Sequence, residues 1–124
     1  MPDRIPIVIS FRLRPDLVEQ IEAVDPRIET RMVPQLGNRQ TGDLPPEEHE
    51  AALAALADAR ILFGPNAIQN RYLDAAPALE WFQTINAGVD HMFELGQLQR
   101  GFTVTTASGL AAAPIAEWVM GALL

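Results

Sequence analysis

The sequence of 124 residues contains no cysteine. Disulfide bonds, thiolate catalysis and cysteine-ligated metal sites are therefore excluded. No apolar stretch reaches the ~20 residues that a membrane span needs. The first apolar run, residues 5–9, lacks the longer apolar region and the cleavage site of a signal peptide. We therefore expect a cytoplasmic protein with no membrane partner.

Positive charge is also scarce. Nine basic residues stand against 16 acidic ones, which gives a net charge of -7, and the basic residues are arginines scattered along the chain. A nucleic-acid surface needs clustered positive charge, so we expect no nucleic-acid partner. A small organic acid stays compatible with this composition, because the local groups of a pocket decide what it binds.

Short β-rich runs alternate with helical segments along the chain. Because parallel strands joined through helices need crossover connections, the alternation predicts a parallel sheet covered on both faces. The length suits one domain. We expect an α/β fold over residues 1–110, a flavodoxin-like doubly wound five-stranded parallel sheet in the order 2-1-3-4-5. The expected strands are residues 5–9, 28–33, 61–63, 81–85 and 102–106.

The last segment, residues 111–124, predicts a helix that protrudes from this domain. Pro114 lies in its first turn and Glu117 follows closely, and both favour a helix start. The remaining residues are apolar nearly all round, and such a helix must be covered on more than one side. One small domain covers one side only. We therefore interpret residues 111–124 as the start of an interdomain helix whose second domain lies beyond Leu124.

The motif Asn-Ala-Gly-Val-Asp-His at residues 86–91 lies where the fourth strand gives way to a helix. This is the carboxyl edge of the sheet, where open α/β folds bind ligands. Ala87 and Gly88 are small enough for a ligand to approach the backbone, and their N–H groups suit a carboxylate or a phosphate. The alternative is a tight turn that needs glycine only for its dihedral angles.

Two further loops follow strands at the same edge. Residues 106–110 contain Ser108, for which helix capping is favoured over ligand binding. The third loop is Gly64-Pro65-Asn66. If the predicted strand order is right, the three loops converge on one cleft.

We assign no catalytic residue and no metal ligand in this chain. We expect His49 to be solvated on the polar face of an acidic helix. His91 would lie in the first turn of a helix, where packing or capping is favoured over general base catalysis because no reacting partner is evident. Glu117 is expected in the first turn of the last helix, where the helix dipole alone is a sufficient reason for an acidic residue. The sequence has no G-x-G-x-x-G run.

Three segments together resemble the D-2-hydroxyacid dehydrogenase family. Residues 81–91 resemble the family's "AGVD" turn, residues 100–109 are similar to its "RGI-V-N--G" strand and loop, and residues 113–119 resemble its "--VAE" helix start. Spacing and order agree from about Ile61 onward. Before Ile61 only the alternation of strands and helices supports the resemblance.

The resemblance implies that the chain is the flavodoxin-like, substrate-binding domain of that family. The backbone amides of Ala87 and Gly88 would hold the substrate carboxylate, with Gly64 nearby. Asn86 and Ile115 would lie near the cofactor. Two positions depart from the family: Ile115 is often threonine there, and Ala87 is lysine in some members.

The implied parent enzyme is an NAD(P)-dependent 2-hydroxyacid dehydrogenase, that is, a 2-keto acid reductase. Its catalytic arginine, glutamate and histidine, and its Gly-rich loop, would lie beyond Leu124. This chain alone is therefore predicted to be inactive and to bind neither NAD nor NADP. Its implied partners are a small 2-keto or 2-hydroxy acid and the nucleotide-binding domain.

Other modules with this fold are less compatible with the sequence. A receiver needs carboxylates after the first strand and a flavodoxin a hydroxyl- and Gly-rich loop there, whereas residues 10–14 read Ser-Phe-Arg-Leu-Arg. A non-catalytic flavodoxin-like dimerisation or binding module stays open. It would form a homodimer through residues 111–124.

Overall fold

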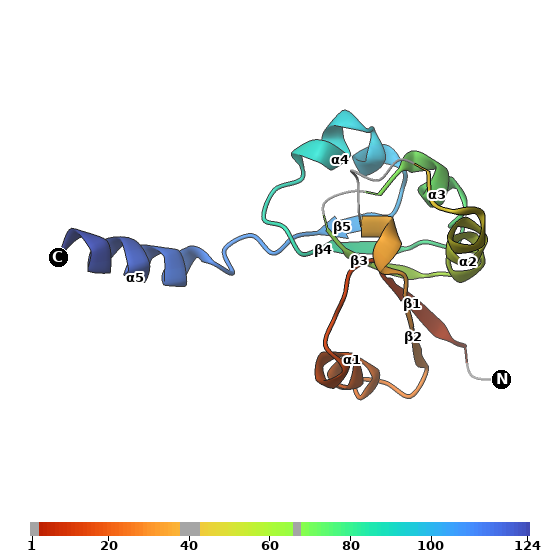
Figure 1. Ribbon diagram of the computed structural model, residues 1–124, viewed down its shortest axis with the longest axis horizontal. Coiled ribbons are helices and arrows are strands. Elements are labelled where there is room, and N and C mark those ends of the chain that lie inside the picture. The colour runs from red at the N-terminus through yellow and green to blue at the C-terminus, as the bar shows by residue number, and fades with distance from the viewer. Residues whose placement is uncertain (1–2, 38–42, 66–67) are drawn as a thin grey trace.

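The computed structural model describes residues 3–37, 43–65 and 68–124, which form an α/β fold around one parallel sheet (Figure 1). All neighbouring strands pair in parallel in the order β2-β1-β3-β4-β5, which confirms the predicted strand order. The strands are β1 (Ile5–Ile9), β2 (Ile28–Met32), β3 (Ile61–Gly64), β4 (Trp81–Thr84) and β5 (Thr103–Thr105).

Short helices connect the strands. The α-helices are α1 (Pro15–Glu22), α2 (Pro46–Leu56), α3 (Asn70–Asp74), α4 (Asp90–Glu94) and α5 (Ala112–Leu123), and two 3₁₀ turns are η1 (Pro34–Gly37) and η2 (Gln97–Gln99). Helix α2 begins with a proline and places Glu47 and Glu48 in its first turn, where the helix dipole stabilises negative charge. Figure 1 shows α2, α3 and α4 on one side of the sheet and α1 on the other.

The hydrophobic core lies between the sheet and the three helices α2, α3 and α4. Side chains that alternate along the central strands point into it, and they are fully buried at Val8, Leu62 and Phe82. Leu56 of α2 and Met92 of α4 cover them. The inward-facing positions of the strands were thus set by the two-residue period of β structure.

The opposite face of the sheet is only partly covered, so the expectation of two covered faces is wrong for β4 and β5. Trp81 of β4 is 39% exposed, and Thr105 of β5 is exposed beside it. The Trp81 Nε1–H group donates a hydrogen bond to Thr105 Oγ1 at 2.6 Å, and Thr105 Oγ1 in turn bonds Gln83 Oε1. Polar side chains therefore occupy a face that a parallel sheet usually buries under a helix.

The spacing of Val89, Met92, Phe93 and Leu98 in the sequence predicts one apolar helical face after β4, and the structure interrupts this face. Helix α4 ends early because Gly96 adopts φ +68°, a left-handed conformation that favours glycine and stops a helix. Met92 is buried, but Phe93 is 72% exposed. The prediction that Phe93 packs on the same face as Met92 is wrong, because one turn of helix can turn only one of two adjacent residues inward.

Helix α5 projects away from the sheet, as predicted (Figure 1). None of its residues is buried, and Trp118 is 74% exposed. Glu117 lies in the second turn of α5, which begins at Ala112, so the prediction of a first-turn position for this residue is wrong. Among the described helices, none has the length and hydropathy that a membrane crossing requires.

We expect one pair of hydrogen-bonded charges, Asp25 and Arg27, to make the stability of the fold depend on acid. Arg27 donates to the carboxylate of Asp25 from its backbone N–H at 2.8 Å and from its guanidinium, which lowers the pKa of Asp25 from 3.8 to about 2. Because the folded pKa is depressed, this contribution is present above pH ~4 and is lost as the pH falls towards 2. Asp25→Asn should therefore melt below wild type at pH 6, with the difference in Tm shrinking towards zero at pH 2.

Circular dichroism melts of both proteins across this range measure the difference. A constant difference in Tm from pH 6 to pH 2 would contradict the prediction, because the asparagine would then act through something other than lost charge.

Candidate functional site

The turn that follows β4, residues 86–89, is held in place at its first carbonyl group. The backbone oxygen of Asn86 accepts a hydrogen bond from Thr84 Oγ1 at 2.9 Å and another from the N–H of Ala107 at 3.0 Å. Thr84 is fully buried. The turn is thereby tied both to its own strand and to the loop that follows β5, so its backbone is positioned before any ligand arrives.

The next two residues of this turn, Ala87 and Gly88, present their backbone to the surface. Both are exposed, and among the described residues their N–H groups donate to no other backbone carbonyl. Gly88 does not adopt a positive φ, and a Cβ added there would meet only Asp90 Oδ2, at 3.9 Å. The alternative that this turn needs glycine for its dihedral angles is therefore wrong.

Gly64 is the third predicted substrate-binding residue. Close packing around it leaves no room for a side chain. It ends β3 in a buried position, and a Cβ there would lie 1.8 Å from Ser10 Oγ. Its carbonyl oxygen accepts the N–H of Ile85 at 2.9 Å. The fold alone accounts for this glycine, and its contact with a substrate stays a prediction.

A hollow of about 460 Å³ lies at the carboxyl ends of β4 and β5. It brings together Ile85, at the start of the loop after β4, and the loop that follows β5, whereas Ala87 and Gly88 are not among its lining residues. Pro65 of the third loop lines a different hollow, and Asn66 lies outside the described residues. The hollow at the carboxyl ends of β4 and β5 is lined by Phe63, Gln83, Thr84, Ile85, Thr106, Ala107, Ser108 and Leu110.

The capping role predicted for Ser108 is wrong. Helix α5 begins four residues later, and its N-cap residue, Ala111, makes no side-chain hydrogen bond. Ser108 is exposed, and its backbone N–H donates a long hydrogen bond of 3.3 Å to Thr106 Oγ1. Ser108 lines the hollow, and its side chain does not cap the helix.

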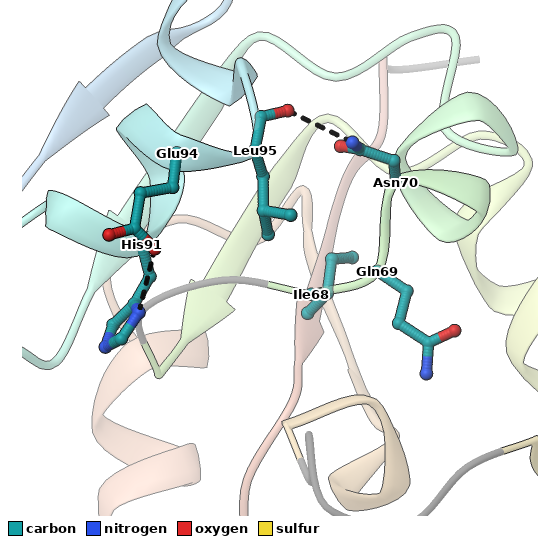
Figure 2. Close-up of a pocket in the computed structure, with 6 residues that line it drawn as sticks. All are labelled: Ile68, Gln69, Asn70, His91, Glu94 and Leu95. Atoms are coloured by element: carbon teal, nitrogen blue, oxygen red, sulfur yellow. Dashed lines mark hydrogen bonds and ion pairs between the residues drawn. The ribbon is translucent and has the colours of Figure 1, made fainter.

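A second hollow, of about 450 Å³, lies between the start of α3 and helix α4 (Figure 2). The His91 side chain on its rim is 47% exposed, and its Nδ1 atom lies 4.0 Å from Glu94 Oε2. Helix α4 has no side-chain cap. The packing or capping role predicted for His91 is therefore wrong for the described chain, and its imidazole is exposed beside a carboxylate.

Sequence analysis missed Gln97, which holds the wall of this second hollow together. Its side chain is fully buried, and its Nε2 group donates to the carbonyl of Ile68 at 2.7 Å and to Asn70 Oδ1 at 3.0 Å. Asn70 Nδ2 in turn donates to the carbonyl of Leu95 at 3.1 Å, as Figure 2 shows. No sequence signal marks such a glutamine, because this residue type is mostly exposed.

His49 differs from its predicted solvated position. It is half-buried on α2, and its Nδ1 atom lies 3.2 Å from the hydroxyl oxygen of Tyr72. The pair joins α2 to α3 and lies away from the turn after β4. Among the described residues, no group of three histidine, aspartate or glutamate side chains is arranged to hold a metal ion.

The comparisons with known proteins find similar solved structures but no matching sequence family. No protein-family model matches the sequence, and no curated protein sequence matches it. The solved structure of a D-isomer specific 2-hydroxyacid dehydrogenase family protein from Aeromonas salmonicida subsp. salmonicida superimposes with a TM-score of 0.69 at 20% identity. The match covers 98% of this chain and 35% of that one. The chain thus has the fold of part of a dehydrogenase and spans about a third of its length.

Proposed function

We propose that this chain is the substrate-binding domain of an NAD(P)-dependent D-2-hydroxyacid dehydrogenase, an enzyme that reduces a 2-keto acid. The observation that carries the proposal is the turn after β4. Ala87 and Gly88 present two backbone N–H groups without backbone partners, at a position where the fold itself has room for a Cβ. A glycine that the fold does not need is explained by a ligand that approaches the backbone closely.

The two N–H groups suit the carboxylate that every 2-keto acid carries. Hydrogen bonds from backbone N–H to a carboxylate are charge-assisted and stronger than neutral ones. They need no cationic side chain, so they are compatible with a chain of net charge -7. Because the Asn86 carbonyl is already held by Thr84 and Ala107, the turn would orient the acid without rearranging.

The described residues fit only one end of a nicotinamide cofactor. Leu110 is 79% exposed and offers an apolar surface in the hollow. Asn86 and Ile115, which is 60% exposed, would be the other contacts of the cofactor. The sequence has no G-x-G-x-x-G run to hold the pyrophosphate. NAD or NADP, when bound in the complete enzyme, would supply the hydride, and this domain would position the acid beside it.

Helix α5 would then lead into the nucleotide-binding domain and pack against it. Its exposed apolar residues are Ile115, Trp118, Val119, Met120, Leu123 and Leu124. A helix that is apolar nearly all round is stable when other elements surround it. The structural neighbour supports this arrangement, since the match covers only 35% of its own length. A nicotinamide-dependent reduction also fits the cytoplasmic location expected from the sequence.

We expect Trp118 to report on this packing. In the present chain its indole is 74% exposed, so its fluorescence should be strongly quenched by acrylamide. In a protein that extends through the nucleotide-binding domain, the emission should shift to shorter wavelength and the quenching should fall several-fold. A Trp81→Phe background removes the other tryptophan.

The same measurement tests the alternative function, a non-catalytic module that dimerises through α5. That alternative predicts that the present chain shields Trp118 as its concentration rises, with a dimer in sedimentation. Shielding that needs the extension and is independent of concentration supports the dehydrogenase.

Enzyme assays test the proposed activity directly. The complete gene product should oxidise NADH or NADPH in the presence of glyoxylate or hydroxypyruvate, and the present chain alone should not. No rate above background with any small 2-keto acid would contradict the proposal.

A further inference from the structure

A third hollow lies where the strand order reverses. In the order β2-β1-β3-β4-β5, the chain leaves β1 towards one edge of the sheet and β3 towards the other. Such a switch point leaves a crevice outside the carboxyl ends of the two strands, and open α/β sheets bind ligands there. Here the crevice is a hollow of about 330 Å³, which we name the switch-point hollow. It is lined by Ser10, Phe11, Arg12, Pro34, Gly37 and Pro65.

Arg12 is the cationic group of this hollow, and its charge is not neutralised. Of the arginines in the part of the chain that the structure describes, it alone has no carboxylate partner. The other seven each form an ion pair: Arg4, Arg14, Arg27, Arg31, Arg60, Arg71 and Arg100. In a chain with 16 acidic residues, an arginine without a partner at a ligand-binding edge is an attractive site for an external anion.

Ser10 provides a second, independent sign of a ligand. Its side chain is fully buried at the end of β1, and its hydroxyl oxygen has no hydrogen-bond partner. A buried polar group without a partner costs about 1–3 kcal/mol, so such groups are uncommon in folded proteins. The backbone N–H of Ser10 is already used, since it donates to the carbonyl of Phe63 at 2.9 Å. The hydroxyl, which packs against Gly64, is the group of Ser10 that has no partner.

The remaining wall of the hollow excludes competing charge. None of the six described residues that line it is acidic. Gly37 brings η1 against the end of β1 so closely that a Cβ there would lie 2.2 Å from the Ser10 carbonyl oxygen. Beyond Ser10, the N–H groups of Phe11 and Arg12 donate to no backbone carbonyl among the described residues. Two backbone N–H groups without a backbone acceptor therefore lie beside the guanidinium-bearing residue in the chain.

We propose that the switch-point hollow binds a small oxyanion group, a carboxylate or a phosphate, through the guanidinium of Arg12 and the hydroxyl of Ser10. A planar guanidinium offers two parallel N–H donors to such a group. The site is separate from the turn at Ala87 and Gly88, because β3 lies between β1 and β4 in the sheet. The inference does not depend on the proposed dehydrogenase function.

Titration by NMR tests the site. The ¹⁵N-labelled protein is titrated with inorganic phosphate and, separately, with malonate, with sodium chloride used to hold the ionic strength constant. We expect saturable shifts of the amide signals of Ser10, Phe11, Arg12 and Gly37. The anion that saturates at the lower concentration identifies the source, phosphate ester or organic acid.

Two arginine variants separate a site from general attraction. Arg12→Gln should weaken binding about ten-fold or more, the loss expected for charge-assisted hydrogen bonds. Arg14→Gln removes the same charge two residues away, from a side chain that is already paired with Asp16 at 2.8 Å, and should leave the affinity within about two-fold.

Ser10→Ala supplies a readout that does not depend on charge. Without anion it should raise Tm by a few degrees, because it removes a buried hydroxyl that has no partner. It should also weaken anion binding. The proposal is overturned if wild type shows no saturable shifts with either anion, or if Arg12→Gln and Arg14→Gln bind equally well. Affinity unchanged in Ser10→Ala overturns the role of the hydroxyl.

Discussion

Replacement of Gly88 by alanine should lower kcat/KM of the complete enzyme for a 2-keto acid by about 10- to 100-fold, while Tm stays within about a degree of wild type. The loss corresponds to one weakened charge-assisted hydrogen bond, worth about 1.5–3 kcal/mol. The stability is kept because the backbone of Gly88 has no positive φ and a Cβ there meets only Asp90 Oδ2, at 3.9 Å. Steady-state kinetics and a thermal melt measure the two effects.

Gly64→Ala is the matched control, since it should show the opposite pattern. The Cβ of the new alanine would lie 1.8 Å from Ser10 Oγ in a buried position. The variant should therefore lose stability, seen as a lower Tm, rather than substrate binding. Combining Gly64→Ala with Ser10→Ala should recover part of that loss, because the colliding oxygen is gone. If Gly88→Ala proves destabilising, or if the variant enzyme keeps full activity, the carboxylate does not contact this turn.

The largest loss of stability is expected from Gly37→Ala. A Cβ at this position would lie 2.2 Å from the carbonyl oxygen of Ser10 and 2.8 Å from Cγ of Pro65. Neither neighbour yields easily, because one is the backbone at the end of a central strand and the other is a proline ring. Overpacking of this kind costs typically 1–3 kcal/mol and occasionally more, so Tm should fall by roughly 5–15 °C.

Gly121→Ala makes the same chemical change where the structure leaves open space. Gly121 lies in the exposed helix α5, with nothing within 4 Å of an added Cβ. Alanine favours a helix over glycine by about 1 kcal/mol, so Tm should stay unchanged or rise slightly. A similar fall in Tm for both variants would show that the close contact between η1 and β1 is not the cause of the lower stability of Gly37→Ala.

The sequence determined the elements of the fold and most of their positions. The apolar run of β1 and the alternating pattern of β2 predicted strands at residues 5–9 and 28–33, and the structure has them at Ile5–Ile9 and Ile28–Met32. The apolar surface of residues 111–124 predicted a helix that the domain does not cover. These signals are local, because strand and helix periods depend on residues that are close in sequence.

The candidate site was predictable only in outline. The strand order placed the loops after β4 and β5 at one edge, and they do line one hollow. The sequence did not show that Gly64 is required for packing whereas Gly88 is not, because the difference lies in what surrounds each Cβ. It also gave no sign that Gln97 is buried, since its partners Ile68 and Asn70 lie 29 and 27 residues away.

By itself, then, the sequence determined the parallel sheet and the exposed apolar helix, because patterns of apolar residues and turns record which face of each element must be buried. The strand order was a choice among the doubly wound folds, and the structure confirms it. Only the tertiary structure decided which arginine is unpaired, which hydroxyl lacks a partner and which face of β4 and β5 is open. Arg60 and Glu80, 20 residues apart, form an ion pair, while Arg12 finds no such partner. Charge pairing and side-chain packing depend on distances that exist only after the chain has folded.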